Sequence, residues 1–173
     1  MTFPIVRNEH RNNILHMTIA PAEVSEDVAK EAHELALRLA QGFELAGILA
    51  IELFVTKDER VIVNELAPRP HNSGHYTIEA CSFDQFDAHI RGIAGWPLEQ
   101  PELLKPAVMV NVLGQHVAPT RALIAEHPEW NMHDYCKAEV RHDRKMGHIT
   151  VLTDDTRQTV ADLERTGCWD DLK

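Results

Sequence analysis

The residues best suited to chemistry are two glutamates, Glu52 and Glu65, each set inside an apolar segment. Glu52 lies in the run Gly47–Val55, and Glu65 lies in the run Val61–Ala67, with the polar residues 56–60 between the two runs. Apolar runs separated by a short polar segment are typical of a β-hairpin. The hairpin therefore has one carboxylate on each strand.

The turn decides whether these carboxylates meet. If Asp58 and Glu59 form a two-residue turn, Glu52 and Glu65 are directly opposed. Like charges at opposed positions destabilise a sheet unless a cation compensates, and Mg²⁺ suits a few carboxylate oxygens plus phosphate oxygens. The alternatives are an exposed strand face that tolerates two acids, or a shifted turn that separates them. The face with the two glutamates would also carry Phe54, Val61 and Val63.

A loop dense with polar side chains follows the second strand. Arg69 offers a planar fork for a carboxylate, bicarbonate or phosphate, and Asn72 and Ser73 add short polar groups. His71 and His75 have the spacing of a zinc pair on a helix, but the zinc-protease motif has Glu after the first His, and a proline and a glycine here favour a loop. A zinc hydrolase is therefore an alternative that metal analysis would test.

A second cluster of charge lies at residues 137–148. It holds four Lys and Arg residues and two histidines, in a chain whose net charge is −10. A basic island on an acidic chain predicts an anionic ligand rather than nucleic acid, which usually needs a broad positive surface. The alternative is a solvated loop between strands.

The run Asn64–His75 strongly resembles the signature of 5-(carboxyamino)imidazole ribonucleotide synthase, an ATP-dependent ligase of purine biosynthesis in the ATP-grasp superfamily. The similarity continues through Ser82–Ile93 and returns at Lys137–His148. The resemblance implies an α+β fold. Residues 1–105 would be the C-terminal half of an ATP-grasp domain, an antiparallel sheet with helices, and residues 106–173 a small β-rich C-terminal domain.

The resemblance also implies roles for single residues. Glu52 and Glu65 would hold the Mg²⁺ that bridges the phosphates of ATP, and Asn64 would belong to the nucleotide site with them. The residues around bicarbonate and the carboxyphosphate made from it would be Arg69, His71, Asn72 and Ser73, the first three as catalytic residues. The residues that hold the aminoimidazole ribonucleotide and its phosphate would be Lys137, Arg144 and Lys145.

Two expectations concern the basic island. It should fold back to face Arg69–His71, so that both segments surround one anionic pocket. His142 and Asp143 stand where the family commonly has Pro-Gly, which makes the turn before Arg144 the point of departure from the family pattern.

By resemblance, the whole reaction uses ATP to phosphorylate bicarbonate, and the carboxyphosphate then carboxylates the exocyclic amine of 5-aminoimidazole ribonucleotide. In the family, an N-terminal ribonucleotide-binding domain and a smaller ATP lobe precede this region. The chain is therefore expected to be a C-terminal fragment that is inactive alone. The alternative is a non-catalytic binding or dimerisation module of the same fold, and the family suggests a homodimer.

Length and composition limit the classes of protein to which this chain can belong. A chain of 173 residues with 44% hydrophobic content can bury a core. It has no apolar run near the roughly 20 residues that span a bilayer and no signal-peptide pattern, which predicts a cytoplasmic protein without a membrane or nucleic-acid partner. The cysteines form no Cys-x-x-Cys unit, so buried or incidental thiols are expected.

The remaining elements follow from periodicity and from proline and glycine. A serine at position 25 should cap the first helix. The pattern predicts helices over residues 25–41, 83–93 and 121–126, and strands over residues 3–7, 14–19, 107–113, 132–136 and 149–152.

Overall fold

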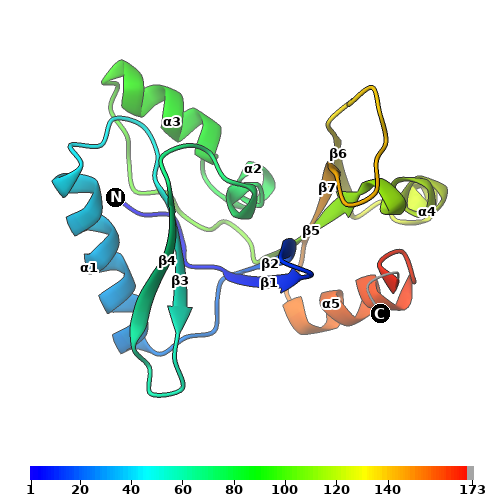
Figure 1. The fold of residues 1–173 in the computed structure, drawn as a ribbon, viewed down its shortest axis with the longest axis horizontal. Coiled ribbons are helices and arrows are strands. Elements are labelled where there is room, and N and C mark those ends of the chain that lie inside the picture. The colour runs from blue at the N-terminus through cyan, green and yellow to red at the C-terminus, as the bar shows by residue number, and fades with distance from the viewer. Residues whose placement is uncertain (171–173) are drawn as a thin grey trace. The chain divides into compact units, whose positions relative to one another are not determined.

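The structure is a computed structural model that describes residues 1–170, and it divides into two compact units (Figure 1). The first unit comprises Met1–Ile5 and Ala22–Leu104, and the second comprises Val6–Pro21 and the chain from Lys105 onward. Both units contain an antiparallel sheet and helices, which confirms the α+β class. Compact units and family domains are different divisions, so the domain boundary after residue 105 stays a prediction.

The first unit packs one long helix against a two-stranded hairpin. Its elements are α1 (Glu26–Gly42), β3 (Ala50–Val55), β4 (Val61–Ala67), the 3-10 turn η1 (Asn72–Gly74), α2 (Thr77–Ala80) and α3 (Gln85–Ala94). Ser25 caps α1 as predicted, because its Oγ accepts the N–H of Val28 at 3.3 Å. Asp84 caps α3 by accepting the N–H groups of Phe86 and Asp87, so this helix begins later than predicted.

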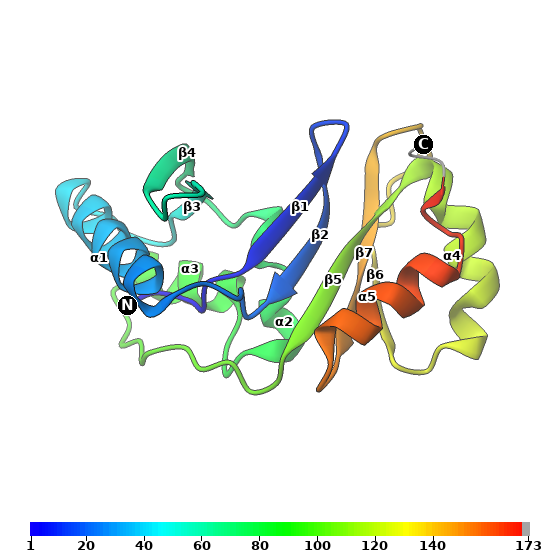
Figure 2. The same cartoon turned by 90° about the horizontal axis from the view of Figure 1, so that it is seen from below.

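The second unit is a five-stranded sheet in the order β1-β2-β5-β7-β6. The strands are β1 (Arg7–Arg11), β2 (Ile14–Ala20), β5 (Ala107–Leu113), β6 (Trp130–Asp134) and β7 (Lys145–Leu152). The helical elements are η2 (Gly114–His116), α4 (Val117–Leu123), η3 (Ile124–Glu126) and α5 (Thr156–Arg165). Helices α4 and α5 cover one face of the sheet (Figure 2), and the apolar core lies beneath them.

The predicted strand over residues 107–113 is confirmed as β5, whereas several other strands begin or end at residues that differ from the predicted ones. The strand expected over residues 3–7 is wrong, because β1 begins at Arg7, after Pro4, which has no N–H for a ladder. Strand β6 begins and ends earlier than residues 132–136, and β7 begins before residue 149, within the basic island. The island therefore combines a loop with the first residues of a strand.

The second unit contains more helix than the sequence predicted. The helix expected over residues 121–126 begins at Val117, since Pro119 falls in the first turn, where its missing N–H costs nothing. Helix α5 was not predicted, because only Val160 and Leu163 on it face the core and the rest of its sequence is polar. The small second unit is therefore less purely β than expected.

The three cysteines are free thiols, with Cys81 and Cys168 buried and Cys136 exposed. Within residues 1–170, no helix combines the length and the apolar character needed to cross a membrane.

Candidate functional site

The hairpin brings Glu52 and Glu65 together as predicted. The two residues are direct partners in the β3–β4 ladder, and direct partners share a face of the sheet. The ladder is not regular, however. Leu53 pairs with Val63, which leaves Asn64 as an extra residue on β4, in a β-bulge.

The bulge changes which apolar residues accompany the carboxylates. Phe54 pairs with Ile62, so the expectation that Val61 and Val63 share the face of the two glutamates is wrong. Because side chains alternate along β3, Phe54 and its partner Ile62 lie on the carboxylate face, while Val61 and Val63 lie on the other face. The prediction assumed one constant register from turn to carboxylates, and residue alternation alone does not reveal one extra residue.

The bulge also turns Asn64 toward the carboxylate of Glu52. Asn64 Nδ2 donates a hydrogen bond to Glu52 Oε2 at 3.2 Å. His71 Nε2 lies 3.9 Å from Glu52 Oε1, and the two side chains are only 14% and 15% exposed. Three predicted site residues, Glu52, Asn64 and His71, therefore meet beside Glu65.

Gln85 holds the loop that carries His71, and the sequence analysis missed it. The Gln85 Oε1 accepts the N–H of His71 at 2.8 Å, and its Nε2 donates to the carbonyl of His71 at 2.8 Å. The same Nε2 lies 2.9 Å from His75 Nδ1. Gln85 is 2% exposed, so these are buried contacts. The sequence offers only an ordinary polar residue at a helix start as a signal.

Gly74 permits this close contact between the loop and α3. A Cβ at position 74 would lie 2.4 Å from Gln85 Oε1, so a larger residue would displace the glutamine. The ring of His75 stacks on Phe86 at a centroid distance of 5.7 Å. The loop is thus held by its backbone and by one histidine ring.

The other predicted loop residues lie on the same segment. Arg69 is exposed and donates to the carbonyl of its neighbour Pro70 at 3.1 Å. Ser73 Oγ lies 2.9 Å from His71 Nδ1, and Asn72 begins the turn η1. Their polar groups are gathered within one loop, while their roles toward a ligand stay predictions.

His71 and His75 are not arranged as a pair of zinc ligands on a helix. His71 and His75 flank a 3-10 turn rather than sharing a face of an α-helix, and their Nδ1 atoms face Ser73 and Gln85. Across residues 1–170, no group of three or more His, Cys, Asp and Glu side chains is arranged to hold a metal ion. A two-carboxylate site completed by phosphate oxygens needs no such group.

The basic island forms a loop and the start of β7 in the second unit. Lys137 Nζ donates to the carbonyl of Lys145 at 2.5 Å and lies 5.4 Å from the centroid of the Tyr135 ring. Arg144 donates to the carbonyl of Glu139 at 3.1 Å. Two of the three predicted cations therefore lie in one loop and Lys145 begins β7 directly after it, while the convergence of this segment with the loop of the first unit stays a prediction.

Tyr135 yields a prediction for the alkaline pH range. Burial raises its pKa from 10.0 to about 12, and its hydroxyl lies 2.9 Å from His148 Nδ1. Burial also raises the pKa of Tyr76, the other tyrosine. Because the folded state holds these protons more tightly, the stabilisation is complete below pH 10 and is lost as the pH rises from 10 toward 12.

The measurement is an absorbance titration at about 295 nm, with urea denaturation at several pH values. We expect almost no tyrosinate signal near pH 10 in the folded chain and about half of the full signal in urea, where both tyrosines have their ordinary pKa. Tyr135→Phe should remove the step near pH 12. A normal titration of Tyr135 at pH 10 would contradict its burial.

Comparisons with known proteins match both parts of the chain. Residues 1–86 match the ATP-grasp domain, and residues 107–162 match the phosphoribosylaminoimidazole carboxylase C-terminal domain. The N5-carboxyaminoimidazole ribonucleotide synthase of Staphylococcus aureus strain COL is 48% identical over 162 residues, which cover 93% of this chain and 43% of that protein. This chain therefore spans less than half the length of that relative.

Solved structures give the same result. The ADP complex of an N5-carboxyaminoimidazole ribonucleotide synthetase has a TM-score of 0.94 and 44% identity, covering 97% of this chain and 45% of the other. The Aspergillus clavatus N5-carboxyaminoimidazole synthase in complex with ADP and 5-aminoimidazole ribonucleotide has a TM-score of 0.88 and 32% identity, covering 98% and 47%. The chain belongs to the N5-carboxyaminoimidazole ribonucleotide synthase family, in which it corresponds to the C-terminal ATP-grasp region and the C-terminal domain.

Proposed function

We propose that this chain supplies the carboxylate half of an ATP site and a phosphate-binding loop to an enzyme that carboxylates 5-aminoimidazole ribonucleotide. The observation that carries the proposal is the pairing of Glu52 with Glu65, beside the bulged Asn64 and His71. Relatives crystallised with ADP and with the ribonucleotide support the same ligands here.

The donor set fits a magnesium ion. Glu52 and Glu65 offer carboxylate oxygens on one strand face, and the hydrogen bond from Asn64 orients the Glu52 carboxylate. These two glutamates would hold Mg²⁺, which when bound supplies positive charge to the phosphates of ATP. Asn64 would then act on the nucleotide site through Glu52.

The loop residues would bind the small anions of the reaction. A bicarbonate oxygen attacks the γ-phosphorus, the bond to the leaving ADP oxygen breaks, and carboxyphosphate forms. The exocyclic amine then attacks the carboxyl carbon, phosphate leaves, and the amine loses a proton. Arg69, His71, Asn72 and Ser73 would hold bicarbonate and carboxyphosphate, because their polar groups lie on one loop anchored by Gln85. In phosphoryl transfer, such positioning and charge stabilisation are the main contribution of the protein.

The chain alone is expected not to catalyse this reaction, because it spans 43% of the length of its Staphylococcus aureus relative and the remainder would have to complete the ATP clamp. The measurement is phosphate release from ATP by the purified chain. Release that requires both bicarbonate and 5-aminoimidazole ribonucleotide would contradict the expectation. Binding of nucleotide without turnover would agree with it.

The proposed function itself is tested by a chimera that joins the N-terminal remainder of the Staphylococcus aureus relative to this chain. We expect phosphate release that depends on bicarbonate and the ribonucleotide, with formation of the carboxylated product. A folded chimera without activity would instead support the alternative of a non-catalytic binding or dimerisation module.

We further propose that the complete protein is a cytoplasmic homodimer whose ligands are small molecules, with no membrane or nucleic-acid partner. The support is the family resemblance and the net charge of −10, which does not favour a polyanion. Sedimentation of the chimera would measure its oligomeric state.

A further inference from the structure

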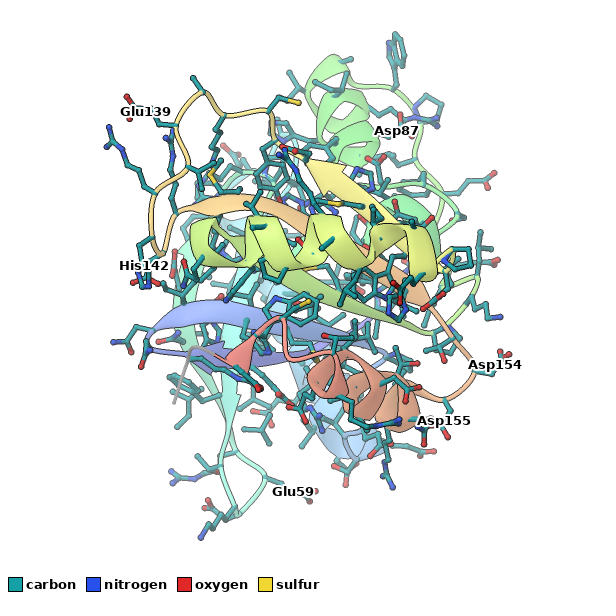
Figure 3. The ribbon with its side chains drawn as sticks, turned by 90° about the vertical axis from the view of Figure 1, so that its right-hand side faces the viewer. Glu59, Asp87, Glu139, His142, Asp154 and Asp155 are labelled. Atoms are coloured by element: carbon teal, nitrogen blue, oxygen red, sulfur yellow. The ribbon has the colours of Figure 1, made fainter. Side chains whose placement is uncertain are left out.

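The loop that carries the cations begins and ends in an unusual backbone conformation. Cys136 has φ 51° and Asp143 has φ 59°, both in the left-handed region that favours glycine. The loop projects beyond α4, and the side chains of Glu139 and His142 point outward from it (Figure 3). A loop with this exposure needs specific contacts to keep two non-glycine residues left-handed.

Gln115 supplies such contacts to Asp143. Gln115 Nε2 donates to Asp143 Oδ1 at 3.0 Å, and the backbone N–H of Asp143 donates to Gln115 Oε1 at 2.9 Å. The amide group of Gln115 therefore hydrogen-bonds to both the side chain and the backbone of the left-handed Asp143. Both atoms of the Gln115 amide are used, so no shorter or singly polar side chain reproduces the contact.

The backbone next to Gln115 supports the same turn. A Cβ on Gly114 would lie 1.9 Å from the carbonyl oxygen of Arg141, which shows how closely η2 and the loop approach. The N–H of Arg144 donates to that same carbonyl at 3.1 Å and closes the turn. The turn from Arg141 to Arg144 is thus seated on Gly114 and Gln115.

The other end of the loop is held in a similar way. Asp134 Oδ1 accepts the N–H of Cys136 at 2.8 Å, and Asp134 Oδ2 accepts a hydrogen bond from Arg121 of α4. Both left-handed residues are therefore tied, directly or through a carboxylate, to the segment that contains η2 and α4.

We propose that Gln115 is a positioning residue that sets Arg144 for the phosphate of a ribonucleotide by holding Asp143 left-handed. The inference rests on the proposed function and on the role that the family resemblance implies for Arg144, which is to hold that phosphate. A glycine at position 143 would adopt this left-handed conformation without such contacts. Aspartate stands there instead, and the two hydrogen bonds from Gln115 hold it in that conformation. The guanidinium of Arg144 uses one N–H on Glu139, and its fork has further donors for an anion.

The test measures binding of ribose 5-phosphate to the whole chain by titration calorimetry or NMR, with ribose as the unphosphorylated control. Gln115→Ala should weaken binding about fivefold, since two hydrogen bonds are lost, and should speed hydrogen exchange of the Asp143 amide. Adding Asp143→Gly to Gln115→Ala should restore affinity to within about twofold of the original chain, because glycine adopts the left-handed conformation without the hydrogen bonds of Gln115. Gln158→Ala, which removes an exposed glutamine contact on α5, is the matched control.

Rescue by glycine separates positioning from a general effect on folding. Unchanged binding by Gln115→Ala, or a double variant as weak as the single one, would overturn the proposal. If Gln115→Ala does not fold, Asp143→Gly and Asp143→Ala are compared with Gln115 intact. The proposal requires the glycine variant to bind better, and equal binding overturns it.

The proposed function has its own readout in the same experiment. Arg144→Ala should lose binding of ribose 5-phosphate. If it does not, the substrate role of Arg144 is wrong, while the exchange rate of the Asp143 amide still reports whether Gln115 holds the turn.

Discussion

Replacement of Glu65 by glutamine is expected to lower kcat of the chimera about a hundredfold or more without lowering its stability. Glutamine keeps the volume of the side chain but removes one of the two opposed carboxylates. The remaining Glu52 would hold a magnesium ion weakly, and the phosphates of ATP would lose the compensating charge. The measurement is steady-state ATP turnover at saturating Mg²⁺, with urea denaturation of the same preparation.

The sign of the stability change makes this prediction specific. In the metal-free chain, Glu65→Gln should raise the free energy of unfolding by about 0.2–1 kcal/mol, because it relieves repulsion between opposed like charges. Added Mg²⁺ should stabilise the original chain more than the variant, in which only Glu52 remains to bind the ion. Glu99→Gln, an equal change of charge at an exposed position in the segment after α3, is the control. Loss of activity in proportion to lost folded protein would contradict the metal assignment.

The second large effect is expected at Gln85. Gln85→Leu should lower the free energy of unfolding by about 3 kcal/mol, because it leaves the N–H and carbonyl of His71 without the partners they have in a buried environment. The loop should also become mobile, so His71 would no longer stay near Glu52. Urea denaturation of the chain measures the first effect, and the chemical shifts of the His71 ring measure the second.

A matched pair of variants separates the contacts of Gln85 from a general effect of glutamine removal. Gln158→Leu changes an exposed glutamine that contacts Asp162, and we expect less than about 0.5 kcal/mol of change. Gln85→Glu keeps the acceptor for the His71 N–H but loses the donor to its carbonyl, so it should fall between Leu and Gln. A Gln85→Leu chain as stable as the original would show that the loop has another anchor.

The parts of the fold that the sequence predicted well are those with a strong local pattern. Residues 107–113 form an uninterrupted apolar strand, and Ser25 has the geometry of a helix cap. The opposed position of Glu52 and Glu65 was also predicted, although the assumed register near the turn was wrong. Near the turn the strands pair one residue out of the predicted register, and the bulge at residue 64 shifts the register back so that Glu52 faces Glu65. Such a shift depends on how the strands pair and cannot be predicted from residue types.

The missed features depend on contacts between distant residues. Gln85 lies 14 positions from His71, and Gln115 lies 28 positions from Asp143. No local sequence pattern therefore indicates that either glutamine hydrogen-bonds to its loop. Helix α5 was missed for a different reason, since its buried face is too small to give a clear periodicity. The pairing of the two carboxylates was thus predictable from the sequence, whereas the residues that position the two loops were not.

The bulge at Asn64 also bears on how this hairpin tolerates insertions and deletions during evolution. The strand tips pair through Val55 and Val61, while the carboxylates pair on the other side of the extra residue. The loop at residues 56–60 can therefore change length without altering which residues oppose each other at Glu52 and Glu65. Deletion of residue 64 itself would place Glu65 directly after Val63, so Glu65 would still pair with Glu52, but the hydrogen bond from Asn64 to Glu52 would be lost. Both the hairpin tip and the irregular residue can thus be lost or changed while the acidic pair stays opposed, and what loss of Asn64 removes is the amide that holds the Glu52 carboxylate.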